Sequence, residues 1–157
     1  MWSRRRQSVI LVIVLAGLLS ASAVIYFGDF ENVRGKINPQ RVARGQEIYG
    51  VYCAACHGAN LEGQNNWRQR GADGLLPAPP HDETGHTWHH PDQQLFQLIK
   101  LGTEAMVGGD YKSTMEGFGD RLSDEDISAV IEFIKSSWPE EIRRRQADVT
   151  ARAVKVE

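Results

Sequence analysis

Residues 53–57 read Cys53-Ala54-Ala55-Cys56-His57 and contain both cysteines of this 157-residue chain. Two thiols separated by two residues, with a histidine directly after the second, have the spacing that attaches c-type haem. In that chemistry each thiol bonds to one vinyl group of the porphyrin, and the neighbouring imidazole offers a nitrogen to the iron. The motif therefore predicts one covalent haem c bound through Cys53 and Cys56, with His57 as an axial ligand.

Two other chemistries use paired cysteines. A zinc site needs two further Cys or His ligands, and the histidines at 81, 86, 89 and 90 keep that interpretation open. A thioredoxin-type redox pair needs a strand–helix–strand context, and the sequence after residue 57 has no such pattern. Haem attachment is favoured over both, because the compartment predicted from the N-terminus and a second candidate iron ligand agree with it.

Residues 1–28 are predicted to be a membrane anchor. Three arginines at positions 4–6 precede an uncharged run over residues 9–27, which would span about 28 Å as a helix, close to the thickness of a bilayer core. A small-residue cleavage site at 21–23 would make the segment a signal peptide, but the run stays apolar beyond it. An uncleaved single-pass anchor is therefore favoured over a cleaved signal.

The arginines should stay in the cytoplasm, which would put the rest of the chain on the periplasmic side of a bacterial inner membrane. Covalent haem attachment takes place outside the bacterial cytoplasm, so the two predictions agree. Residues 29–138 carry ten basic and sixteen acidic side chains. This mildly acidic balance argues against nucleic acid as a partner.

The remaining chain is predicted to be a short linker (29–38), one all-α domain (39–138) and a helical tail (139–157). Asn38 followed by Pro39 is typical of a helix start, and a helix is expected over residues 40–52. Gly45 inside that helix would allow another helix to cross closely, with Tyr49 packing against the partner. Further helices are expected over 93–101 and, after a capping pair of Ser123 and Asp126, over 124–138.

Residues 58–85 and 103–121 are predicted loops. In the first, Leu75 and Leu76 are candidates for lining the haem, and a carbonyl of the proline-rich stretch 77–80 could accept the second ring N–H of His57. Trp67, Arg68 and Arg70 are interpreted equally well as partners of haem propionates or as solvated surface.

Met115 is the candidate for the second axial ligand of the iron. It lies in a glycine-bordered loop about sixty residues after the attachment motif, where a thioether can reach the haem face opposite His57. His/Met ligation is the usual arrangement for electron transfer. Met106 is interpreted mainly as a packing residue.

With residues 53–57, the Gly45/Tyr49 pair, Met115 and the run 118–124 before an Ile-rich helix, the chain resembles a class I cytochrome c. More narrowly, it resembles bacterial membrane-anchored monohaem cytochromes c over residues 39–138. The resemblance implies an all-α fold whose first and last helices cross near Gly45, with Phe133 at the contact. One departure is Glu116, because the family often has proline after the ligating methionine, and a glutamate there lacks proline's rigidity.

The histidines His81, His86, His89 and His90 form a cluster with two interpretations. They could hold a copper or zinc ion through their imidazoles, or they could be part of a polar loop near the haem edge.

The sequence favours an electron carrier that exchanges electrons with redox proteins of the membrane or periplasm, and it contains no recognisable catalytic constellation. Two alternatives remain. One is a haem-containing subunit or domain of a respiratory or redox enzyme, which could also hold a second metal at the histidines, and the other is a gas sensor.

Overall fold

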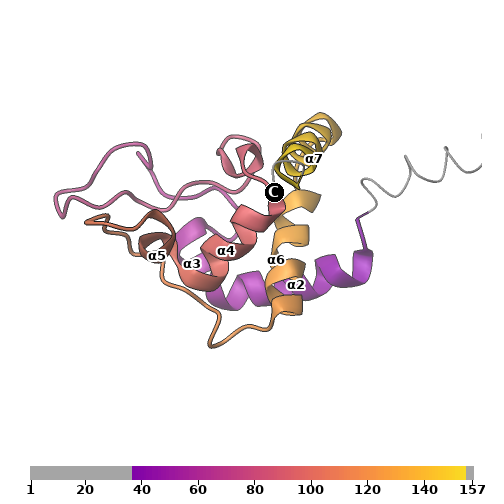
Figure 1. Cartoon of the computed structure of the whole chain (residues 1–157), viewed down its shortest axis with the longest axis horizontal. Coiled ribbons are helices and arrows are strands. Elements are labelled where there is room, and N and C mark those ends of the chain that lie inside the picture. The colour runs from indigo at the N-terminus through magenta and orange to yellow at the C-terminus, as the bar shows by residue number, and fades with distance from the viewer. Residues whose placement is uncertain (1–36, 155–157) are drawn as a thin grey trace, which may run out of the picture. The chain divides into compact units, whose positions relative to one another are not determined.

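In residues 37–154, the part of the chain that the computed structural model describes, the regular secondary structure is helical (Figure 1). The helices are α2 (Pro39–Tyr52), α3 (Ala54–His57), the 3-10 turn η1 (Thr87–His89), α4 (Asp92–Leu101), α5 (Thr103–Val107), α6 (Asp124–Ser136) and α7 (Glu140–Val154). The all-α class is confirmed for this part of the chain. The anchor predicted at 1–28 lies outside the described residues, and no helix within 37–154 is long and apolar enough to cross a bilayer.

Helix α2 begins where Asn38 caps it. The side-chain oxygen of Asn38 accepts hydrogen bonds from the amides of Gln40 (3.0 Å) and Arg41 (3.2 Å), and Pro39 occupies the first turn, where a missing N–H costs nothing. The predicted cap is confirmed, and the helix starts one residue earlier than expected.

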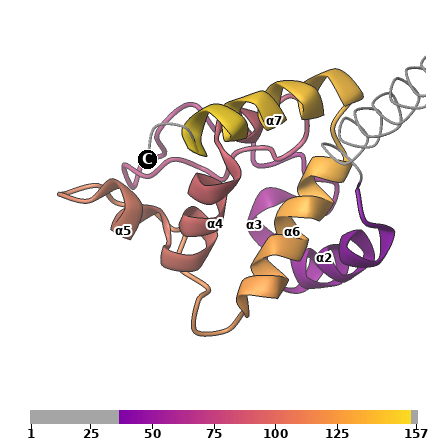
Figure 2. The same cartoon turned by 45° about the vertical axis from the view of Figure 1, so that its right-hand side comes forward.

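Helices α2 and α6 cross at Gly45, as expected (Figure 2). A Cβ on Gly45 would lie 2.0 Å from the backbone oxygen of Ala129 and 2.9 Å from Cβ of Phe133, so only glycine permits this approach. One turn further on, the rings of Tyr49 and Phe133 pack with their centroids 5.3 Å apart. The first and last helices of the predicted domain therefore pack in close contact at one glycine.

The segment between α4 and α6 corrects one prediction. Residues 103–121 were expected to be loop throughout, but Thr103–Val107 forms the short helix α5. Glycines bound it on both sides: Gly102 (φ +85°) ends α4, and Gly108 (φ +74°) ends α5 with its N–H on the carbonyl of Glu104, 2.9 Å away. Five residues are too few for a helical period to stand out in the sequence.

Helix α6 has the predicted start and an earlier end. The Ser123 hydroxyl accepts a hydrogen bond from the amide of Asp126 at 3.1 Å. The helix stops at Ser136, two residues short of the predicted end at Trp138, because Pro139 disfavours helical geometry at the residue before it. Trp138 is nevertheless 1% exposed and donates its indole N–H to the carbonyl of His81 at 2.7 Å.

Helix α7 packs on the domain. Figure 2 shows it running over the N-terminal end of α4, and its Gln146 is fully buried. The Gln146 amide nitrogen donates to the carbonyl of His90 (3.2 Å) and to a carboxylate oxygen of Asp92 (2.6 Å), while Thr150 accepts from the Asp92 amide. The segment after Pro139 therefore closes over η1 and the start of α4.

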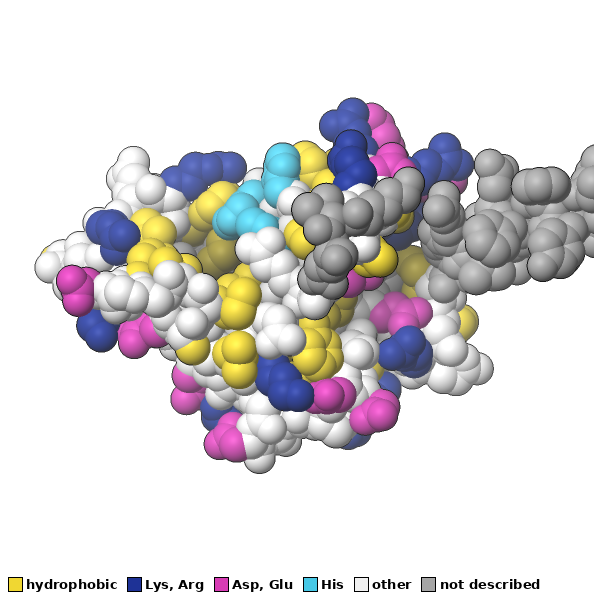
Figure 3. Space-filling model, viewed as in Figure 1, with side chains coloured by type: hydrophobic (Ala, Val, Ile, Leu, Met, Phe, Trp, Pro, Cys, Tyr) yellow, Lys and Arg dark blue, Asp and Glu magenta, His cyan; other side chains and the backbone are white. Residues whose placement is uncertain are grey.

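Large apolar side chains remain at the surface, as the yellow patches in Figure 3 illustrate for one face. Six of them in the described residues are exposed: Val51, Tyr52, Leu76, Leu101, Val107 and Val154. Val51 and Tyr52 end α2, and Leu101 and Val107 end α4 and α5. Apolar surface is therefore left uncovered just before residues 53–57 and in the helices that precede Met115.

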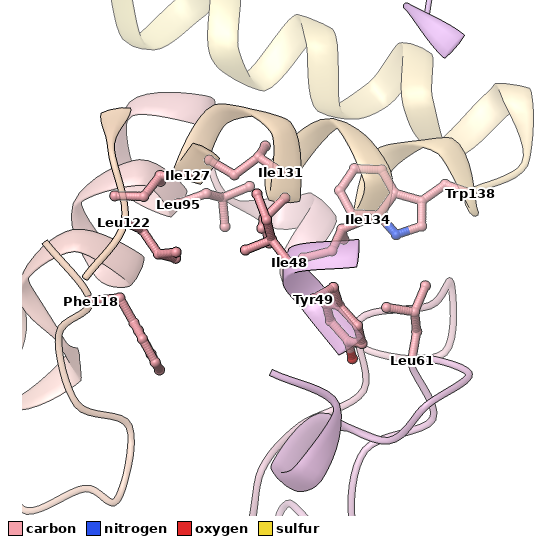
Figure 4. Packing of buried hydrophobic residues seen from close by; sticks show 11 residues of the cluster. Ile48, Tyr49, Leu61, Leu95, Phe118, Leu122, Ile127, Ile131, Ile134 and Trp138 are labelled. Atoms are coloured by element: carbon pink, nitrogen blue, oxygen red, sulfur yellow. The ribbon is translucent and has the colours of Figure 1, made fainter. Parts of the chain in front are cut away.

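The buried core joins these helices. Figure 4 shows Phe118 and Leu122 at one end of the cluster and Leu61 and Trp138 at the other, with Ile48 of α2 between them. Cys53 and Met115 are both half-buried and pack against this same cluster. The core thus brings the attachment motif and the candidate ligand loop to one apolar centre.

Candidate haem-attachment site

The attachment motif occupies the turn between α2 and α3. The His57 amide donates to the carbonyl of Cys53 at 2.9 Å, so Cys53, Cys56 and His57 stand at positions i, i+3 and i+4 of a helical turn, on one face. Both thiols are free; Cys53 is half-buried and Cys56 is exposed. Two free thiols and one imidazole on a single face of the turn are the groups that covalent haem attachment requires.

His57 has a fixed tautomer. Its side chain is 6% exposed, and Nδ1 lies 2.9 Å from the carbonyl oxygen of Pro79. A carbonyl can only accept, so Nδ1 carries the proton and Nε2 keeps its lone pair free for a metal. Burial lowers the pKa of His57 below its ordinary 6.5, and the bond to Pro79 partly offsets that effect. The carbonyl contact expected from the proline-rich stretch is confirmed.

The loop that supplies Pro79 is held against the attachment turn by main-chain bonds. The Gly63 amide donates to the carbonyl of His57 (2.7 Å), and the Gln64 amide donates to that of Ala78 (2.8 Å). Gly63 has φ +68°, and a Cβ there would lie 2.4 Å from the Pro80 nitrogen. This long loop is therefore ordered by its own hydrogen bonds and by glycine contacts with its proline-rich stretch.

His81 lies directly against His57. Their rings stack with centroids 4.0 Å apart and an interplanar angle of 22°. Burial, followed by the neighbouring His57 and His86, holds the pKa of His81 well below its ordinary value, so the ring is neutral at physiological pH. Sequence reasoning grouped His81 with the other histidines and missed this contact.

The Met115 loop is fixed to the end of α4. The Thr103 amide donates to the carbonyl of Met115 (3.1 Å), and the Phe118 amide donates to that of Ile99 (2.9 Å). A Cβ on Gly117 would lie 2.7 Å from the backbone carbon of Leu101. Main-chain bonds and close glycine packing thus supply the rigidity that Glu116, in place of proline, does not. Glu116 itself pairs with Arg121 at 3.0 Å on the surface.

One aromatic contact connects the two halves of the site. Tyr52, the residue before Cys53, packs edge-on against Phe118, three residues after Met115, with ring centroids 6.2 Å apart. The attachment motif and the candidate ligand loop, some sixty residues apart in sequence, therefore meet in the folded chain.

The zinc and thioredoxin interpretations lose support from the same geometry. Burial, and secondarily Cys56, raises the pKa of the Cys53 thiol to about 11, whereas metal-binding and redox cysteines need accessible thiolates. Within residues 37–154 no group of three or more Cys, His, Asp or Glu side chains could hold a metal ion.

The other histidines divide among different neighbours. His86 stacks on Trp67 (5.4 Å between centroids) and His89 stacks on Trp88 (3.7 Å), while His90 meets His86 edge-on. Figure 3 shows histidine side chains gathered on one face. Each of these three rings therefore has an aromatic neighbour within residues 67–90, a contact that fits the interpretation as a polar loop.

The candidate propionate partners remain at the surface. The Arg68 guanidinium lies 3.9 Å above the Trp67 ring, and Arg70 donates to the carbonyl of Gly74 at 2.7 Å. Both arginines are exposed. Each therefore has a partner within the chain, and neither is drawn into the core.

A helical domain with a free thiol pair, an imidazole of fixed tautomer and uncovered apolar surface defines a protein with a covalently attached haem. A family model described as cytochrome c matches residues 42–138, and the chain belongs to that family. It is also similar to the gluconate 2-dehydrogenase cytochrome c subunit of Pantoea cypripedii, with 27% identity over 139 residues. That match covers 88% of this chain and 29% of the relative, so the chain spans less than a third of the relative's length.

The cofactor is accordingly haem c, bound covalently, and the domain works in haem-based electron transfer. The residues present fit this group, since Cys53 and Cys56 have the required spacing and no disulfide joins them.

Proposed function

We propose that the protein is a class I, membrane-tethered electron carrier of the periplasm, with one haem c bound by Cys53 and Cys56 and with His57 and Met115 as axial ligands. The observation that carries this proposal is the fixed position of both ligand segments on one core. The His57 ring is held by Pro79 at 2.9 Å, and the Met115 carbonyl is held by the Thr103 amide at 3.1 Å.

Rigid ligand segments favour electron transfer over ligand binding. When bound, haem c supplies one-electron exchange between ferric and ferrous iron. The chain's own residues keep that exchange fast by moving little. The carbonyl of Pro79 holds His57, and the Met115 loop is held by the bond from the Thr103 amide and by the bond to the Ile99 carbonyl. The buried cluster that contacts Cys53 and Met115 places apolar side chains beside the same centre, and such a shell limits the access of solvent.

Tethering and location rest on the N-terminal sequence. The uncharged run at 9–27 after three arginines supports a single-pass anchor with the haem domain in the periplasm. The proposed partners are redox proteins of the membrane or periplasm. The acidic balance of residues 29–138 speaks against nucleic acid.

A second candidate function is a haem subunit of a dehydrogenase complex. The similarity to the cytochrome c subunit from Pantoea cypripedii favours it, although this chain covers only 29% of that protein.

Purification from solubilised membranes distinguishes the two functions. A free carrier should sediment with membranes through residues 1–28 and elute as a haem protein without a stoichiometric partner. An anchor-deleted variant carrying a cleavable signal should appear in the soluble periplasm with an unchanged haem spectrum. Co-elution of a flavin- or quinone-containing dehydrogenase at equal stoichiometry would instead establish the subunit function. Haem protein in the cytoplasm would contradict the proposed topology.

A further inference from the structure

His81 is held in place from three directions. Its backbone amide donates to the carbonyl of Leu61 at 2.7 Å, and its own carbonyl accepts the indole N–H of Trp138 at 2.7 Å. Its ring nitrogen Nδ1 lies 2.8 Å from the Thr87 hydroxyl. Its ring therefore presents a fixed face to whatever lies against it.

That face covers the imidazole of His57. The two ring centroids are 4.0 Å apart and the planes are inclined by only 22°, a stacked geometry in which aromatic rings attract. The bond from Nδ1 to Pro79 holds one edge of the His57 ring. Contacts at the two ring nitrogens, to Pro79 and in the holoprotein to iron, leave the tilt of the ring plane free, because the ring torsion of histidine has a broad energy minimum. A partner on the ring face removes this remaining freedom.

We propose that His81 is a positioning residue that fixes the orientation of the His57 ring through face-to-face stacking, with Thr87 holding His81 in turn. This inference rests on the proposed function, in which His57 is an iron ligand. It assigns His81 a role separate from that of His86, His89 and His90, whose rings contact tryptophans or one another.

The direct readout is hydrogen exchange of the His57 ring N–H, followed by NMR in the ferrous full-length holoprotein. That proton is protected by the bond to Pro79, and it exchanges only when the ring swings away. His81→Ala should accelerate the exchange roughly five- to tenfold, because the stacking contribution is lost. His81→Phe should restore most of the slow exchange, to about the rate of Thr87→Val, since it keeps an aromatic face but loses the bond to Thr87. Thr87→Val, which is nearly isosteric, should give a smaller acceleration.

His89→Ala is the matched control, because His89 stacks on Trp88 and is exposed. In this variant the His57 ring N–H should exchange at the wild-type rate. Thermal unfolding and backbone amide exchange of α6 are measured on the same samples. Acceleration confined to the His57 ring N–H supports positioning. An unchanged rate in both His81→Ala and Thr87→Val, or an acceleration matched by the α6 amides, would overturn it.

The absorbance spectrum separates this inference from the proposed function. A low-spin six-coordinate spectrum with unchanged ring N–H exchange in the variants would overturn the role of His81 alone. A wild-type spectrum without His57 ligation would overturn both.

Discussion

Gly45 of α2 lies against the backbone carbonyl of Ala129 in α6, so closely that a Cβ on residue 45 would be 2.0 Å from that oxygen. The neighbouring atoms belong to backbone and to Cβ of Phe133, which cannot move aside as a flexible side-chain tip would. The crossing of the two helices therefore depends on the absence of a side chain at one position. The residues that pack next to this crossing, Ile48 and Tyr49, belong to the core that Cys53 borders.

Gly45→Ala should lower the free energy of unfolding by about 2–3 kcal/mol, because the added methyl group forces the helices apart. Gly50→Ala is the control in the same helix, since nothing lies within 4 Å of a Cβ there. It should raise stability by up to about 1 kcal/mol through helix propensity. Denaturant unfolding of both holoproteins measures the difference. Equal stabilities would show that the crossing tolerates a methyl group.

Met115→Ala should remove the charge-transfer band between sulfur and ferric iron and open a coordination position. Met106→Ala is the control, because Met106 is a half-buried side chain of α5; it should leave the band unchanged. Optical spectra of the ferric proteins distinguish the two. Loss of the band in Met106→Ala, with the band retained in Met115→Ala, would mean that Met106 is the iron ligand and Met115 is not.

Gly117→Ala should weaken the packing of the Met115 loop on the end of α4 without changing any ligand of the iron. The new Cβ would lie 2.7–2.8 Å from backbone atoms of Leu101 and Lys100, so the loop must move off the end of α4. We expect the charge-transfer band to disappear at a lower temperature than in the wild type, before global unfolding.

Gly108→Ala controls for this change, because a Cβ there meets nothing within 4 Å and only its positive φ is strained. In Gly108→Ala the charge-transfer band should disappear at nearly the same temperature as in the wild type. Identical melting of the band in Gly117→Ala and wild type would contradict the proposed clamp on the loop.

Gln146→Leu tests whether α7 stabilises the domain. The substitution removes the donor to the His90 carbonyl and to the Asp92 carboxylate. Both acceptors are partly buried, so we expect a cost of about 1 kcal/mol. Arg144→Ala removes an exposed pair with Glu140 on the same helix and should cost at most about 0.5 kcal/mol. Thermal unfolding measures the stability of both variants. Equal losses of stability would mean that α7 does not stabilise the domain.

Local signals in the sequence predicted much of the fold. The caps at Asn38 and Ser123, the crossing at Gly45 and the carbonyl contact to His57 each depend on a residue type at one position, and all four occur in the structure. The bounds differed where a neighbouring proline acts, as at Trp138 before Pro139.

What the sequence could not indicate depends on tertiary contacts. Helix α5 is too short for a periodic pattern, and the docking of α7 rests on a polar residue, Gln146, that hydrophobic periodicity overlooks. The stacking of His81 on His57 joins residues 24 positions apart through a loop without regular structure. For α7 and for His81, the feature that only the folded chain displays is a contact made by a polar side chain with residues distant in the sequence.

Carbon monoxide binding to the ferrous full-length protein tests the central claim most directly. If His57 and Met115 close both axial positions on rigid segments, the ferrous spectrum should be that of low-spin six-coordinate haem. It should change little on exposure to carbon monoxide, while the Met115→Ala protein binds the gas rapidly. Rapid binding by the wild type, at a rate equal to that of Met115→Ala, would mean an open iron and would contradict the account of this protein as an electron carrier.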